Sequence, residues 1–292
     1  MPIVTSNTWS PRADRCQHDW VILCSHCLFL LLSPAPSLLA LQTASSTNGN
    51  RSISINPRQR QEILKELPSI QSFQKTPSSR FLVDLKDVRR GHPYLGKRAE
   101  RPHSGGHVYF KLPPKSKTTS PRDYPPIYAV ADGVITRVDY SFELKSMFEP
   151  ALAKQVANQR YGIGLTFAAD GETAITFHYS IEPFIRPDEL KFYEQFIMVK
   201  AGQRVKKGEV IAKMFLPLNS QLAQKSHIHF NLLREGGGGF ISPSIFSPAV
   251  VRLFHARWNL FPNHPDGPIP PCMGYLLNPS ENPFERRAVD RL

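Results

Sequence analysis

Two histidines stand two positions apart in the stretch SHIHFNL, residues 226–232. In a β-strand, successive side chains alternate between the two faces, so His227 and His229 point to one face while Ile228 and Phe230 point to the other. Neutral imidazole nitrogens bind zinc and also act as general acids and bases near neutral pH. The spacing therefore predicts a strand with one apolar face and one face that can bind a metal or transfer protons.

Three further histidines lie in short motifs that could meet this pair. His178 follows an apolar strand-like run in FHYS, and His103 and His107 stand four residues apart in RPHSGGHVYFKLPP, residues 101–114. A zinc hydrolase needs several such ligands, one open coordination position and a nearby group that takes up a proton from water. These segments carry the side chains whose types could take part in such chemistry.

Alternating, β-branched segments predict the strands that would carry these side chains. Asp170–Gly171 stands between two such runs, and an Asp-Gly pair is a strong signal for a tight hairpin. The predicted fold class is all-β and antiparallel, with short helical insertions and extended termini. The predicted strand regions are 127–140, 161–180, 197–215 and 227–233, and the predicted helical insertions are 142–159 and 186–196.

The composition divides the chain into four regions. The apolar stretch WVILCSHCLFLLLSPAPSLLALQTASS follows Arg12 and Arg15 and ends in small residues, which is typical of a secretory signal or an N-terminal anchor that contacts the membrane. Prolines cluster toward both ends, which favours one folded middle with extended flanks. The predicted regions are a signal peptide or anchor (1–44), a linker or pro-segment with a short helical patch (45–84), the β-core domain (85–255) and a Pro-rich C-terminal tail (256–292).

The formal net charge of +12 favours anionic surroundings such as membrane head groups or an acidic cell-wall polymer. No lysine or arginine run and no RNA-binding aromatic motif accompanies this charge, so nucleic acid is not the predicted partner. Three of the four cysteines lie in or beside the N-terminal apolar stretch, which excludes a disulfide framework in the folded region.

The order of these motifs resembles the lysostaphin/LytM-type zinc endopeptidases. AVADGVITRV comes first, then YGIGLTF with FHYS, then VKAGQRVKKGEVIAKM, and finally SHIHFNL; together they cover about residues 125–233, with a weaker extension back to about 100. The VxxGxxVxxGxxI turn is shared with lipoyl-type domains, whereas its combination with HxH and the histidine of FHYS is much more specific. The resemblance implies a β-sandwich with the hybrid motif, a zinc cofactor, and hydrolysis of peptide bonds in peptidoglycan cross-links. It also implies a protein that is secreted or held in the cell envelope.

The resemblance also implies roles for individual histidines. The second histidine of HxH binds zinc in that family, which corresponds to His229 in this chain. The first histidine of HxH and the histidine of the preceding strand flank the attacking water and the scissile carbonyl; these correspond to His227 and His178. A histidine in such a place acts as a general base or stabilises the developing oxyanion.

The family's upstream His-x-x-x-Asp motif has two possible alignments here. In the first, His103 is the histidine and His107 replaces the aspartate, so that the metal ligands are His103, His107 and His229. In the second, His107 is the histidine and Lys111 stands where the aspartate belongs, and a protonated lysine cannot bind zinc. The first alignment predicts a zinc endopeptidase, and the second predicts a binding or regulatory module of the cell envelope that lacks zinc.

A third hypothesis is a carrier domain of the lipoyl or biotinyl kind. Such domains need a modifiable lysine at a hairpin tip, and Lys206–Lys207 does lie in a predicted turn. The HxH pair has no role in a carrier domain, which argues against this hypothesis.

Overall fold

The computed structural model describes most of the predicted core domain and the segment before it. Within the signal or anchor region 1–44 it describes only residues 43 and 44. Within the C-terminal tail 256–292 it describes only residues 256 and 257. Within the described ranges, no helix is both long enough and apolar enough to cross a membrane. The described residues are 43–47, 50–93, 105–112, 120–143, 147–149, 154–156, 159–185, 191–235, 239–241 and 244–257.

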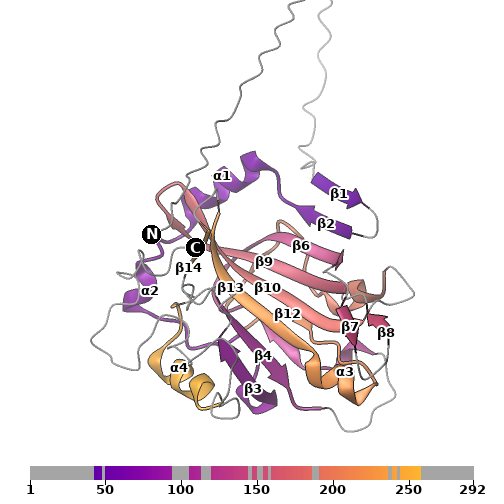
Figure 1. Cartoon of the computed structure of the whole chain (residues 1–292). Helices are drawn as coiled ribbons and strands as arrows, with labels where there is room; N and C mark the ends of the chain where they lie inside the picture. Colours follow the sequence, from indigo (N-terminus) through magenta and orange to yellow (C-terminus); the bar gives the residue numbers. More distant parts are fainter. Residues whose placement is uncertain are drawn as a thin grey trace, which may run out of the picture. The chain divides into compact units, whose positions relative to one another are not determined.

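The described chain forms a large antiparallel sheet with few helices, which confirms the predicted all-β class (Figure 1). The main sheet has the order β1-β2-β6-β9-β10-β13-β4-β3, with β11 paired to β6 and β14 paired to β13, while β12–β5 and β7–β8 form separate pairs. The strands are β1 (Thr43–Thr47), β2 (Asn50–Ser54), β3 (Val88–Pro93), β4 (Gly106–Phe110), β5 (Pro126–Tyr128), β6 (Gly133–Glu143), β7 (Met147–Glu149), β8 (Lys154–Val156), β9 (Gln159–Asp170), β10 (Thr173–Ile185), β11 (Arg204–Val205), β12 (Val210–Lys213), β13 (His227–Arg234) and β14 (Gly239–Ile241). The helices are α1 (Pro57–Glu66), α2 (Ser72–Lys75), α3 (Ser220–Lys225) and α4 (Pro248–His255), with short 3-10 turns η1 (Leu85–Asp87), η2 (Pro121–Asp123) and η4 (Phe192–Phe196).

The hairpin predicted at Asp170–Gly171 joins the two longest strands, β9 and β10. Asp170 pairs with Thr173 across the turn, and Gly171 has a φ of 62°, which a residue with a Cβ adopts only at a cost. The glycine therefore permits the tight turn that brings the two strands into register, and the prediction is confirmed.

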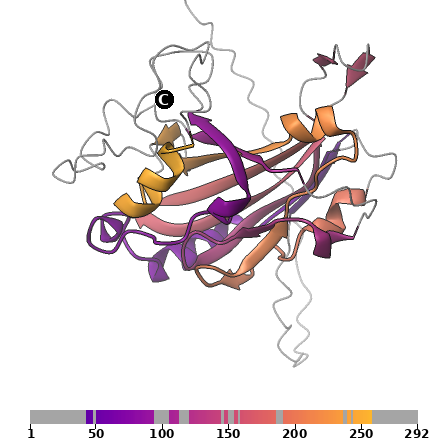
Figure 2. The ribbon, with the colours of Figure 1, turned by 90° about the horizontal axis from the view of Figure 1, so that it is seen from below.

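The alternation in β13 separates an apolar face from a polar one, as predicted. Ile228 and Phe230 have no exposed surface. The Phe230 ring stacks on Phe177 of β10 at 5.8 Å between centroids and meets Phe81 at 5.8 Å and Phe254 of α4 at 5.9 Å. Figure 2 shows α4 against the β3–β4 side of the sheet. The core therefore lies on this face, and the histidines of β13 occupy the opposite face.

The region expected as a linker or pro-segment contributes strands and core residues. Strand β2 pairs with β6, and α1 begins at Asn56, whose side chain accepts a hydrogen bond from the Gln59 N–H in a reciprocal capping box. Ile70 and Leu82 are almost completely buried in the same core as the main sheet. The hydrophobic core thus extends N-terminal to the 85–255 region.

The helical insertion predicted for 142–159 is wrong. Strand β6 continues to Glu143, β9 begins at Gln159, and β7 and β8 between them pair as a short antiparallel ribbon. Pro150 has no N–H to donate to a helix, which disfavours one through the middle of this stretch. In the second predicted insertion, the described residues 191–196 contain the 3-10 turn η4, with Tyr193 and Phe196 buried.

Candidate functional site

The histidines of β13 lie directly opposite aromatic side chains of β4. In this antiparallel pair, His229 is opposite His107 and His227 is opposite Tyr109. Side chains of directly opposed residues project from the same face of a sheet. Two of the three predicted metal ligands, His107 and His229, are therefore neighbours although 122 positions in the sequence separate them (229 minus 107).

Strand β10 borders the same face from the other side. His178 pairs with Asn231 and Ser180 pairs with His229 in the β10–β13 ladder. Glu182 is opposite His227. The four predicted site histidines within the described residues thus share one polar face, while the fifth, His103, lies outside the described residues.

The ring distances test whether these imidazoles suit a single metal ion. The centroid of the His107 ring is 4.9 Å from that of His229 and 4.3 Å from that of His227. Two imidazoles bound to one tetrahedral zinc have ring centroids about 5 Å apart, since each zinc–nitrogen bond is about 2 Å long. His107 and His229 therefore fit as two ligands of one ion.

A third ligand is needed, and the described residues do not provide one. Across the described ranges, no group of three His, Cys, Asp or Glu side chains is arranged to hold a metal ion. Lys111 lies beyond the end of β4, is exposed, and donates its backbone N–H to the Asp87 carbonyl. The residue that faces His229 across the ladder is thus His107, which occupies a ligand position in both alignments, so this register is compatible with either.

Hydrogen bonds constrain the protonation of His227. Its Nδ1 lies 2.9 Å from the Lys225 carbonyl oxygen, which accepts only, so Nδ1 carries the proton. Its Nε2 then presents a lone pair 3.5 Å from Glu182 Oε2, and the Ser180 hydroxyl donates to Glu182 Oε1 at 2.9 Å. Burial lowers the pKa of His227, and the Glu182 carboxylate opposes that shift. A proton taken up at Nε2 would face this carboxylate.

His178 is held in its neutral form. Burial and, next, the nearby Arg160 guanidinium lower the pKa of His178 to about 3, while Asp139 and the Asn231 side chain oppose the shift. A group with so low a pKa is a weak base at neutral pH but can still donate its N–H. His178 is therefore better suited to stabilise negative charge on an oxygen than to remove a proton.

A buried ion cluster supports this end of the polar face. Asp139 is 1% exposed and accepts hydrogen bonds from Arg160 at 3.3 Å and Arg137 at 2.7 Å, and also from the Ser52 hydroxyl of β2. These partners hold the pKa of Asp139 below its usual value even though burial acts to raise it. The carboxylate is thus ionised and fixes Arg160 beside His178.

Tyr109 closes the other end of the histidine group. The centroid of the Tyr109 ring lies 5.0 Å from that of His227. The guanidinium of Arg90, on the neighbouring strand β3, lies 4.4 Å from the centroid of the Tyr109 ring. Burial raises the pKa of Tyr109 to about 12, so its hydroxyl stays protonated. The side chain can therefore donate a hydrogen bond to a group bound next to His227.

Sequence reasoning did not identify several residues of this face. Glu182 and Asn231 each stand an even number of positions from a predicted histidine on the same strand, so the period-two alternation could have found them. Tyr109 stands two positions from His107 and carries the same signal. Arg160 and Asp139 have no motif of their own, and only the packing of β6, β9 and β10 brings them beside His178.

Comparison with known proteins gives limited information. No family model matches the chain, and no curated protein matches it. Solved structures that are similar include a point mutant of the catalytic domain of the prophage-encoded M23 protein EnpA from Enterococcus faecalis, with 15% identity, coverage of 48% of this chain and 75% of that one, and a TM-score of 0.26. Lysostaphin, solved by NMR, shows 15% identity, coverage of 65% of this chain and 54% of that one, and a TM-score of 0.24.

Proposed function

We propose that this protein is a zinc-dependent endopeptidase of the lysostaphin/LytM kind that hydrolyses peptide bonds in peptidoglycan cross-links. The observation that carries the proposal is the register of β4 and β13, in which His107 faces His229 next to His227. This register places imidazole nitrogens from two strands next to one another, and neutral imidazole is a preferred zinc ligand.

The metal ligands in this proposal are His107 and His229, with His103 as the third. Bound zinc would polarise the substrate carbonyl and lower the pKa of water, which is the chemistry that peptide hydrolysis requires. The short segment from His103 to His107 contains Gly105 and Gly106, and glycines let the backbone bend so that both histidines can approach one ion.

The remaining side chains have roles that follow from their protonation. His227 accepts a proton from the attacking water at Nε2 and passes it to the leaving nitrogen, while Glu182 stabilises the intervening imidazolium. Neutral His178 donates its N–H to the oxygen of the scissile carbonyl. This hydrogen bond stabilises the negative charge that develops on that oxygen when water attacks the carbonyl carbon. Tyr109 is a second possible donor to the substrate.

The location and substrate class rest on the sequence. The apolar N-terminal stretch supports export, so the protein is secreted or held in the cell envelope. The net charge of +12 attracts the protein to an anionic wall polymer, which suits peptidoglycan peptide stems as the substrate.

A second candidate is a binding or regulatory module of the envelope that lacks zinc. The sequence feature behind it is Lys111, which stands where the family's aspartate belongs in the second alignment. It would use the same polar face to bind peptide stems without cleaving them.

Elemental analysis of the full-length purified protein distinguishes the two candidates. The proposal expects about one zinc per chain in the wild type and loss of zinc in His229→Ala, His107→Ala and His103→Ala. Lys111→Asp is the matched control, because it creates the aspartate that the second alignment lacks. Under the first alignment it leaves the zinc content unchanged, and a gain of zinc in Lys111→Asp alone would support the second alignment and refute the proposed ligand set. Digestion of muropeptides by the zinc-loaded wild type, abolished in His227→Ala, then tests hydrolysis.

A further inference from the structure

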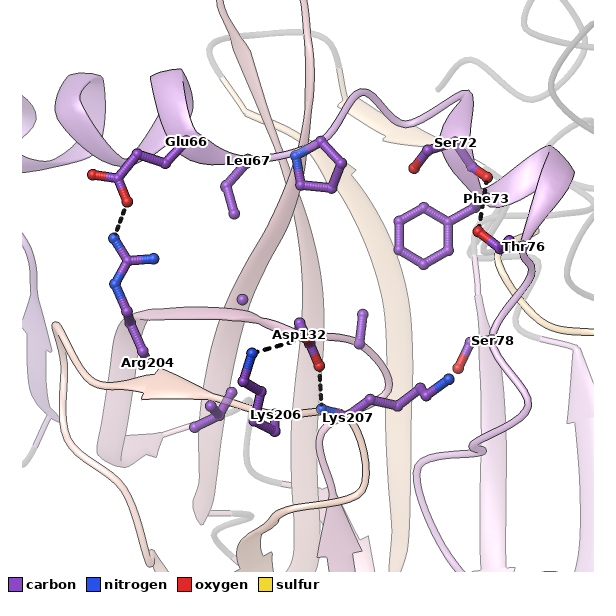
Figure 3. Close-up of a pocket in the computed structure, with 14 residues that line it drawn as sticks. Glu66, Leu67, Ser72, Phe73, Thr76, Ser78, Asp132, Arg204, Lys206 and Lys207 are labelled. Atoms are coloured by element: carbon purple, nitrogen blue, oxygen red, sulfur yellow. Dashed lines mark hydrogen bonds and ion pairs between the residues drawn. The ribbon is translucent and has the colours of Figure 1, made fainter.

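A pocket of about 680 Å³ lies on a part of the molecule that shares no lining residue with the histidine face (Figure 3). One wall comes from residues 66–78, which include the end of α1 and helix α2. The opposite wall comes from residues 131–133, which lead into β6, and from residues 204–207, which comprise β11 and the two residues after it. A volume of this size is within the range of small-molecule sites, roughly 300–1,000 Å³.

The charged side chains of the pocket are paired, with one exception. Arg204 forms an ion pair with Glu66, and Lys206 forms one with Asp132 at 3.2 Å. Among the described residues, no carboxylate pairs with the ammonium group of Lys207. The pocket lining therefore carries one more positive charge than negative charge, because Asp132 lies near both Lys206 and Lys207 but forms its ion pair with Lys206.

The protein holds Lys207 in position through its backbone. Asp132 Oδ1 accepts a hydrogen bond from the Lys207 N–H at 2.8 Å, and Gly208 with a φ of 88° completes the turn. Figure 3 shows the Lys207 side chain extending across the pocket toward Ser78. The unpaired charge is thus directed along the pocket.

The 66–78 wall of the pocket contributes apolar side chains as well as polar ones. Phe73 lines it, and its ring packs edge-on against the buried ring of Phe167, with centroids 5.0 Å apart. Leu67 and Pro68 line the pocket on the same segment. A ligand body that lies against these side chains would exclude water from an apolar surface.

We propose that this pocket binds a small carboxylate attached to an apolar body, with Lys207 pairing with the carboxylate and Phe73 contacting the body. A single unpaired ammonium neutralises one negative charge. The carboxylates of Glu66 and Asp132 line the same pocket and repel a second negative charge, so a monoanion is favoured over a phosphate dianion. This inference does not depend on zinc or on hydrolysis.

Three probes of the same size and different charge test the inference: benzoate, benzyl alcohol and benzylammonium. Their dissociation constants for the full-length protein are measured by ligand-observed NMR near neutral pH. The expected result is that benzoate binds about three- to tenfold more tightly than benzyl alcohol, because a partly exposed ion pair contributes modestly. Benzylammonium is expected to bind most weakly.

Variants link this preference to the pocket. Lys207→Gln is expected to remove the preference for benzoate, Lys207→Arg to keep it, and Phe73→Leu to weaken all three probes while leaving their order unchanged. Lys200→Gln is the matched control, because it removes one exposed lysine charge outside the pocket lining. Equal affinities for the three probes, or an unchanged preference in Lys207→Gln, would overturn the inference. The His229→Ala variant is expected to bind benzoate like the wild type, which separates this test from that of the proposed function.

Discussion

The neutral state of the partly buried His178 predicts a loss of stability in acid. In the unfolded chain a histidine has a pKa of about 6.5, whereas in the folded protein the pKa of His178 is about 3. Between these two values the unfolded state binds more protons, so the free energy of unfolding falls as the pH falls. The slope approaches about 1.4 kcal/mol per pH unit, which amounts to about 2 kcal/mol between pH 7 and pH 5.

The His178→Gln variant isolates this contribution. Glutamine is polar and does not titrate, so the variant is expected to lose about 2 kcal/mol less than the wild type over the same pH interval. Urea unfolding followed by circular dichroism, at several pH values and with a chelator present, measures the free energy of unfolding of both proteins. Thr173→Ser, at the start of the same strand, is the control and is expected to keep the wild-type pH dependence. Parallel pH profiles for the wild type and His178→Gln would refute the argument that His178 is held neutral by burial.

Three further predictions follow from named contacts. Glu182→Gln removes the carboxylate that raises the pKa of His227, so an NMR titration of this ring is expected to show a lower pKa than in the wild type, and an unchanged value would contradict the contact. Phe230→Ala removes a ring that contacts three others in the core. The variant is expected to lower the free energy of unfolding, measured by urea denaturation, by about 3–5 kcal/mol. A loss under about 1 kcal/mol would show that this side chain contributes little to the stability of the core. Gly171→Ala is expected to lower the free energy of unfolding by about 1–2 kcal/mol because the residue has a φ of 62°. Nothing lies within 4 Å of the position that the alanine Cβ would occupy, so a larger loss would indicate a cause other than backbone strain.

The arrangement of the polar face follows from the pairing of three strands. Opposed residues on β4, β13 and β10 bring four imidazoles onto one face of the sheet. The same strands bury Ile228, Phe230 and Phe177 on their other face, so the packing of the core determines the spacing of the polar side chains. A substitution in the core is therefore expected to disturb the candidate site as well as the stability.

Local patterns in the sequence determined the strands and the face on which each side chain lies. The alternation in HIHF predicted that Ile228 and Phe230 are buried and that the two histidines point the other way, and Asp170–Gly171 predicted the β9–β10 turn. Both depend only on backbone geometry within a few residues. The segment 142–159 was predicted incorrectly because a short apolar pattern fits a helix and a strand almost equally well.

Only the tertiary structure decided which distant residues meet. The sequence did not specify that His107 would face His229, because the register between β4 and β13 depends on how both strands pack on the shared core. The sequence also did not specify that Glu182 would face His227, or that residues 50–83 would contribute to the sheet and the core. Contacts between residues far apart in the chain result from the burial of whole strands, and no local run of residues specifies that burial.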